Sequence, residues 1–163
     1  MKLWHGDRME HLDAAYLAKF LGMAIDDEVY AALEKAGFGE VREAHGFVVQ
    51  RLLTGPQSAS ALAADLDVSQ QLASRWVGEL KTLGLVTAAK GDDGREKRVA
   101  LSAKGERVVK VTREARLKAL QALEKKVGGS ALARLKKDLL GALTALGWDD
   151  AIARRKVRPG RGR

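Results

Sequence analysis

Residues 58–105 read SASALAADLDVSQQLASRWVGELKTLGLVTAAKGDDGREKRVALSAKG and contain the start and stop signals of four short elements. Ser58 or Ser60 caps a predicted helix over 61–66, and Ser69 caps a second helix over 70–83. Gly84 ends the second helix, and residues 85–89 and 98–102 have the alternation of two short strands around a turn at 91–94. The predicted order is therefore helix, turn, helix and β-hairpin.

The helix predicted over 70–83 has an apolar and a polar face. On a helical wheel, one arc of about 140° holds the apolar positions Leu72, Ala73, Trp76, Val77, Leu80, Leu83 and Gly84. The opposite arc begins with two glutamines, a serine and an arginine. Glutamine makes paired hydrogen bonds to adenine and arginine to guanine, so the candidate base-reading residues are Gln70, Gln71, Ser74 and Arg75. The wheel alone leaves open a plain amphipathic helix with a glutamine-rich outer face.

A helix-turn-helix followed by a basic hairpin is the layout of a winged-helix DNA-binding domain. The candidate contacts to the DNA backbone or minor groove are Ser69, Lys81, Arg95, Lys97 and Arg98. Charge favours the same partner, because residues 1–56 hold 6 Lys+Arg against 9 Asp+Glu, whereas residues 57–163 hold 23 against 12. Residues 154–163 contain six basic side chains and are predicted to be a disordered tail. Whether this tail touches DNA stays open.

This segment resembles the MarR (multiple antibiotic resistance regulator) family of winged-helix transcription regulators. The matching stretches are SALAADLDVS (60–69), ASR (73–75), Leu80, LGLV (83–86), DGR (93–95) and VALSAKG (99–105). Two positions depart from the family, which usually has arginine where Gly94 stands and threonine where Ser102 stands. The resemblance implies an obligate homodimer with intertwined outer helices that binds a pseudo-palindromic operator. It also implies a small-molecule effector pocket between the dimer helices and the winged helix.

The two ends of the chain are predicted to be helical, over 13–35 and 40–53 before the winged helix and over 103–127 and 131–146 after it. Apolar residues recur every three or four residues in the first and last of these helices, and one chain has too few other elements to cover both stripes. A second copy would cover them. The candidate dimer-interface residues are Leu17, Leu21, Leu132, Leu135, Leu139, Leu143 and Leu146.

The predicted fold class is mainly α with a small β-hairpin wing, that is, a winged helix-turn-helix between dimerisation helices. The expected division, all in one structural domain, is N-terminal dimerisation helices over 1–54, the DNA-binding region over 55–102, C-terminal dimerisation helices over 103–153 and the tail over 154–163. Five residues are interpreted as candidate lining of an effector pocket, although a core or partly buried position is the simpler explanation for each of them: Tyr16, Phe20, Met23, His45 and Phe47.

Other functional classes find little support. The chain has no cysteine, which excludes disulfides and thiolate chemistry, and its three histidines form no pair at metal-ligand spacing, so no metal or cofactor is expected. No nucleophile, base and orienting group can be assembled, so an enzyme is not expected. No secretion signal or membrane-length apolar run is present, and a cytoplasmic, nucleoid-associated protein is expected. A nonspecific or architectural DNA-binding protein and a winged helix used only for protein contacts remain alternatives to a specific regulator, most simply a repressor.

Overall fold

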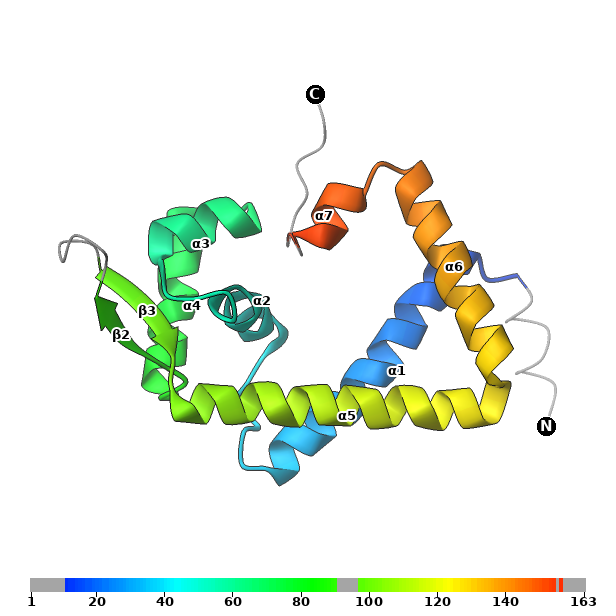
Figure 1. The fold of residues 1–163 in the computed structure, drawn as a ribbon, viewed down its shortest axis with the longest axis horizontal. Coiled ribbons are helices and arrows are strands. Elements are labelled where there is room, and N and C mark those ends of the chain that lie inside the picture. The colour runs from blue at the N-terminus through cyan, green and yellow to red at the C-terminus, as the bar shows by residue number, and fades with distance from the viewer. Residues whose placement is uncertain (1–10, 91–96, 155, 157–163) are drawn as a thin grey trace.

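The computed structural model describes residues 11–90, 97–154 and 156. The longest helix, α5 (Ala103–Val127), runs along one side of the molecule (Figure 1). The winged helix lies at the N-terminal end of α5, and α6 (Gly129–Ala145) leaves its C-terminal end at Gly128. The first helix, α1 (Ala14–Lys35), crosses α5 (Figure 1), and its residues Leu21 and Ile25 line a groove together with α6.

The winged helix consists of three helices and a small antiparallel sheet: α2 (Glu43–Leu52), α3 (Ala59–Leu66), α4 (Gln70–Thr82), β1 (Gln57–Ser58), β2 (Val86–Lys90) and β3 (Lys97–Leu101). The strand order is β1-β3-β2, with Val86 opposite Leu101 and Lys90 opposite Lys97. The mainly helical fold with a β wing, predicted from the sequence, is confirmed.

The helix starts follow from side-chain caps. Ser58 accepts a hydrogen bond from the backbone N–H of Ala61, so Ser58 and not Ser60 is the N-cap of α3. Ser69 does the same for Leu72 at the start of α4, and Ser102 for Gly105 at the start of α5. The turn between α3 and α4 places Asp67 at φ 55°, a left-handed conformation that aspartate tolerates better than most residues. These caps fix where α4 begins.

One hydrophobic core joins α1, the winged helix and the first half of α5. Leu62, Leu66, Leu80 and Leu85 are almost completely buried in it. Gly105 is required where α5 meets the sheet, because a side chain there would lie 2.1 Å from the carbonyl oxygen of Leu85. The core therefore fixes α4 against α2 and α3, and leaves one face of α4 outside.

Several boundaries differ from the prediction. The second helix was expected from residue 40 but begins at Glu43, because Val41 is buried in the core and Arg42 keeps an extended conformation as N-cap. The strand β1 and the helix α7 (Asp149–Ala153) were not predicted, since two and five residues are too short to show a periodicity. Arg95, the turn at 91–94 and all of the tail except Arg154 and Lys156 lie outside the described residues. No helix in the described ranges is long and apolar enough to cross a membrane.

Candidate nucleic-acid interface

The outer face of α4 is open to solvent. Gln70, Gln71, Ser74 and Arg75 are all exposed. Ala73, Trp76, Val77 and Leu80, on the opposite face, are buried at 9% exposure or less. The structure thus brings the four predicted base-reading residues together on the first two turns of one helix, clear of the protein's own interior.

The predicted backbone contacts have different surroundings. Lys81 and Lys97 are exposed, on α4 and at the start of β3. Arg98 is partly buried and takes part in an interaction within the chain. Ser69 is exposed, and although its hydroxyl oxygen accepts the N–H of Leu72, its O–H can still donate to a phosphate.

A carboxylate of α4, Glu79, joins α4 to α2. Its Oε1 accepts a hydrogen bond from Nε of Arg75 at 3.0 Å, and its Oε2 lies 3.0 Å from Nε2 of His45 and also binds the Arg42 guanidinium. His45 is only 1% exposed. Three donors on two helices therefore converge on one carboxylate.

The tautomer of His45 follows from its two contacts. The backbone N–H of Arg42 donates to Nδ1 of His45 at 3.2 Å, and a backbone N–H can only donate. Nδ1 is therefore the acceptor nitrogen, and the Nε2 proton is the one that His45 gives to Glu79. Hydrogen bonds from His45, Arg75 and Arg42 lower the pKa of Glu79 to about 2, so the carboxylate is ionised at neutral pH.

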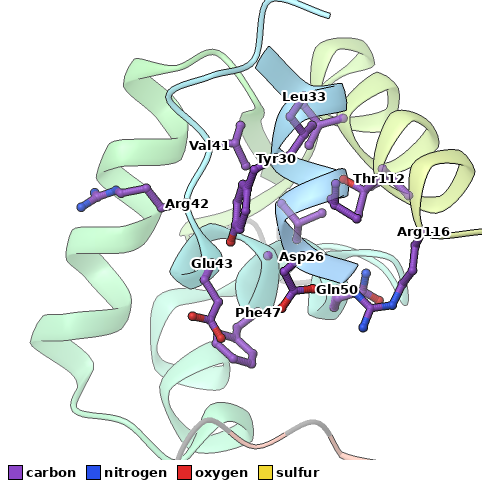
Figure 2. A pocket seen from close by; sticks show the side chains of 15 residues that line it. Asp26, Tyr30, Leu33, Val41, Arg42, Glu43, Phe47, Gln50, Thr112 and Arg116 are labelled. Atoms are coloured by element: carbon purple, nitrogen blue, oxygen red, sulfur yellow. Dashed lines mark hydrogen bonds and ion pairs between the residues drawn. The ribbon is translucent and has the colours of Figure 1, made fainter. Parts of the chain in front are cut away.

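A cavity of about 330 Å³ lies on the other side of α2, between α1, α2 and α5 (Figure 2). Its walls include Val29, Leu33, Val49, Val108 and Val109. Polar groups lie around them, and Figure 2 shows Tyr30 beside Asp26 and Arg42 pointing away from both. Arg116 of α5 donates to Asp26 of α1 at 2.9 Å. The cavity thus combines apolar walls with a few polar groups, as small-molecule sites do.

Tyr30 is one of the polar residues that line this cavity. Burial, with smaller contributions from the charges of Glu43 and Asp26, raises the pKa of Tyr30 above its ordinary value. Its phenol is therefore protonated at neutral pH, and is able both to donate and to accept a hydrogen bond.

The five residues interpreted as pocket lining are not brought together. Only Phe47 lines the cavity. His45 is buried against Glu79 on another side of α2. Tyr16, Phe20 and Met23 are 46–49% exposed on the N-terminal half of α1, where Tyr16 and Phe20 contact each other. The aromatic residue of α1 that lines the cavity is Tyr30, seven residues beyond Met23 and fourteen beyond Tyr16, on the same face of the helix.

The predicted dimer-interface leucines surround an open apolar groove. Leu21 of α1 and Leu132, Leu135, Leu139 and Leu143 of α6 line it, together with residues of α5 and Ile152. Leu17 and Leu146 do not line this groove but are 46% and 72% exposed. No residue of α6, all of which is described, is buried within the chain.

The described part of the chain holds no group of three or more His, Cys, Asp or Glu residues able to hold a metal ion.

Comparison with known proteins identifies relatives by structure only. No family model matches the chain, and no curated protein matches its sequence. Among solved structures, RV1404 from Mycobacterium tuberculosis is 23% identical, with a TM-score of 0.68 over 83% of this chain and 90% of that one. MepR, a transcription regulator of the Staphylococcus aureus multidrug efflux pump MepA, is 16% identical, with a TM-score of 0.65 over 83% and 99%.

A third structure carries the family name directly. It is a MarR-family transcriptional regulator from Rhodococcus, 19% identical, with a TM-score of 0.56 over 77% of this chain and 88% of that one. At these identities the likeness concerns the fold. The chain has the winged-helix fold of MarR-family regulators, as the sequence resemblance implied.

Proposed function

We propose that this protein is a sequence-specific, DNA-binding transcription regulator that acts as a homodimer. The observation that carries the proposal is the exposed face of α4, where four side chains able to bind base edges stand together on the second helix of a helix-turn-helix. A solved structure of a mutant MepR, 16% identical to this chain and with a TM-score of 0.58, contains a bound oligodeoxyribonucleotide. This supports DNA as the partner of the same fold here.

In the proposed complex α4 enters the major groove by its N-terminal end. Gln70, Gln71, Ser74 and Arg75 contact base edges, while Ser69, Lys81, Lys97, Arg98 and Arg95 contact phosphates or the minor groove. Base contacts supply discrimination and phosphate contacts supply affinity without sequence preference. The two groups of residues should therefore respond differently to mutation and to salt.

The apolar groove between α1, α5 and α6 supports the proposed homodimer. Contiguous exposed apolar surface is typical of subunit interfaces. The proposed interface contains Leu17, Leu21, Leu132, Leu135, Leu139, Leu143 and Leu146, with the N-terminal helices over 1–54 and the C-terminal helices over 103–153 as dimerisation elements. Two copies of α4 about one turn of DNA apart would read an inverted repeat.

Regulation by a small molecule is the second part of the proposal. The cavity between α1, α2 and α5 has a volume of about 330 Å³, enough for a compact and largely apolar molecule that hydrogen-bonds to Tyr30. Its walls come from α1 and α5, which also line the apolar groove, and from α2, which packs against α4. A molecule that binds better when these helices are shifted would lower operator affinity by the ratio of its two affinities, as expected of a repressor released by its effector.

Selection of bound duplexes from a random pool tests the DNA-binding proposal. We expect a recovered inverted repeat, and binding of this repeat that exceeds binding of a scrambled duplex by at least about 10³-fold at physiological salt. An equal affinity for both duplexes at two salt concentrations would show nonspecific or architectural binding. No affinity for either would favour a protein-interaction module.

The cavity is tested with a fluorescent apolar probe, 1-anilinonaphthalene-8-sulfonate. Gly46 lines the cavity and has open space where a side chain would stand, so Gly46→Phe is expected to fill the cavity and abolish probe binding. Gly141→Phe is the matched control, because Gly141 also faces open space but lies on α6, away from the cavity. Equal probe binding by both variants would contradict the assignment.

A further inference from the structure

We infer that Glu79 is a specificity-determining positioning residue, which holds the Arg75 guanidinium in the orientation that reads a guanine. This inference rests on the proposed function, since it concerns how one base-reading side chain is aimed. It assigns a role to three residues that would not themselves contact bases: Glu79, His45 and Arg42.

The contact between Glu79 and Arg75 leaves the reading edge of Arg75 open. Glu79 binds the guanidinium at Nε, and the Arg75 side chain remains 67% exposed. A guanine is recognised by two parallel donors, one to O6 and one to N7. A guanidinium that is held at Nε keeps its two terminal nitrogens available as such a pair, so the observed contact orients Arg75 without occupying the edge that reads the base.

An exposed ion pair one helical turn apart would not achieve this alone, because both long side chains lose conformational freedom to form it. Here Glu79 is already fixed. Its second oxygen is bound by the buried imidazole of His45, and by Arg42, the N-cap residue of α2. The conformational entropy of Glu79 is lost when the protein folds. Arg75 is already held by Glu79 in the free protein, so it loses less conformational freedom when it binds DNA.

Charge does not oppose this arrangement. A carboxylate near a phosphate backbone would ordinarily repel DNA. Arg42 and Arg75 both pair with Glu79, and His45 is neutral in the tautomer that its contacts require, so the four groups together carry one net positive charge. Glu79 therefore orients Arg75 while the cluster remains attractive to DNA.

A double-mutant cycle on the duplex selected by the wild-type protein tests the inference. Arg75→Ala is expected to reduce discrimination at one guanine position by about 5- to 150-fold. Glu79→Ala is expected to reduce discrimination at that same position by about 3- to 10-fold, within the range of coupling between contacting residues. The double variant should lose no more than Arg75→Ala. The control, Lys81→Ala, should lower affinity for all duplexes alike.

His45 offers a matched pair that leaves Arg75 and Glu79 untouched. A glutamine amide replaces the Nε2 donor of histidine and an asparagine amide stands near Nδ1, so only His45→Gln retains the donor to Glu79. Both variants lose the buried ring and are compared below their melting temperatures. His45→Gln should keep most of the discrimination at the guanine, and His45→Asn should lose about as much as Glu79→Ala.

The outcomes separate this inference from the proposed function. If the wild-type protein selects no sequence, both fail. If it selects an operator and only Arg75→Ala reduces discrimination, Glu79 has no positioning role. The Glu79→Ala variant could also bind every duplex more tightly while its discrimination at the guanine position stays unchanged. That result would show that Glu79 competes with DNA for Arg75 and would overturn the inference. Equal discrimination by His45→Gln and His45→Asn would also overturn the inference.

Discussion

Two amphipathic helices of this protein, α4 and α6, have similar sequence patterns and different surroundings. In α4 the apolar residues Ala73, Trp76, Val77 and Leu80 are buried by the rest of the same chain, and the polar face is outside. In α6 the leucines recur just as regularly, yet no residue of this fully described helix is buried within the chain. The pattern identifies a face that must be covered, and the fold decides what covers it.

The difference assigns a separate task to each helix. Because packing within the chain fully determines the position of α4, its polar face is presented rigidly, as recognition of a duplex requires. In the proposed homodimer a second copy covers the exposed face of α6 and sets the distance between the two copies of the α4 outer face. Specificity would thus come from α4, and symmetry from α6 together with α1.

The largest expected effect is that of a substitution in α6 on dimerisation and operator affinity. Leu135 is 39% exposed and lines the apolar groove, so Leu135→Asp would place a charge in the proposed interface. We expect monomers in sedimentation velocity. Operator affinity should fall by about 10²-fold or more, because the two copies of α4 are no longer held in one molecule. Lys137→Asp, at an exposed position outside the groove, should remain dimeric.

A change on the apolar face of α4 should lower the stability of the fold and leave dimerisation unchanged. Leu80 is fully buried, and Leu80→Ala is expected to lower the free energy of unfolding by about 2–5 kcal/mol, measured by chemical denaturation. Its sedimentation below the melting temperature should match that of the wild type. A monomeric Leu80→Ala with unchanged stability would reverse the roles assigned to the two helices.

The outer face of α4 should show a smaller and position-specific effect. Gln71→Ala is expected to reduce discrimination by about 1–3 kcal/mol at one or two base pairs of the selected operator. Lys97→Ala should instead weaken all sequences alike and reduce the salt dependence of binding by about one phosphate contact. Fluorescence anisotropy with single-base operator variants at several salt concentrations measures both. If the two variants behave identically, base reading is not a property of this face.

A matched glycine pair sharpens the comparison further. Gly78 of α4 and Gly141 of α6 both lie inside helices with open space where a side chain would stand. Each change to alanine is expected to stabilise the fold by about 1 kcal/mol through helix propensity. Gly78→Ala should also reduce operator affinity, because its methyl group would enter the space between α4 and the duplex. Operator affinity unchanged in both variants would indicate that DNA does not approach α4 at Gly78.

The smallest expected effect is on the pH dependence of the free energy of unfolding. The pKa of Glu79 is lowered from 4.5 to about 2 in the folded protein, so its stabilising contacts are fully present above about pH 4.5 and are lost as pH falls toward 2. Glu79→Gln cannot titrate. The stability difference between the wild type and Glu79→Gln should therefore be constant near neutrality and shrink between about pH 4.5 and 2, measured by thermal unfolding. A difference independent of pH would show that the charge of Glu79 contributes nothing.

Local patterns predicted the elements that local interactions determine. The predicted cap Ser69 and the apolar spacing placed the start of α4 at Gln70, and the polar face of α4 was identified residue by residue. The long helix was expected from residue 103, where α5 begins, whereas α3 begins two residues before its expected start at 61. The burial of Trp76 followed from the same wheel.

The parts that the sequence did not show depend on contacts between distant segments. Glu79 meets His45 and Arg42 across 34 and 37 residues, and no local periodicity indicates such a pairing. The cavity lies at the C-terminal half of α1, where α2 and α5 converge. Tyr30 therefore lines it, whereas Tyr16 and Met23, on the same face of α1, do not. In the sequence, only the seven-residue spacing between Tyr16, Met23 and Tyr30 indicates that they share one face of α1.

The absence of cysteine allows the most direct test of the central claim, that two copies of the α4 outer face stand one turn of DNA apart. A spin label on Ser74→Cys, at an exposed position of that face, would be the only label on each chain. In the homodimer without DNA, where the label does not compete with base contacts, double electron–electron resonance should give one distance near about 34–36 Å, broadened by the label tethers. The absence of any dipolar coupling, or a distance far outside that range, would contradict the account.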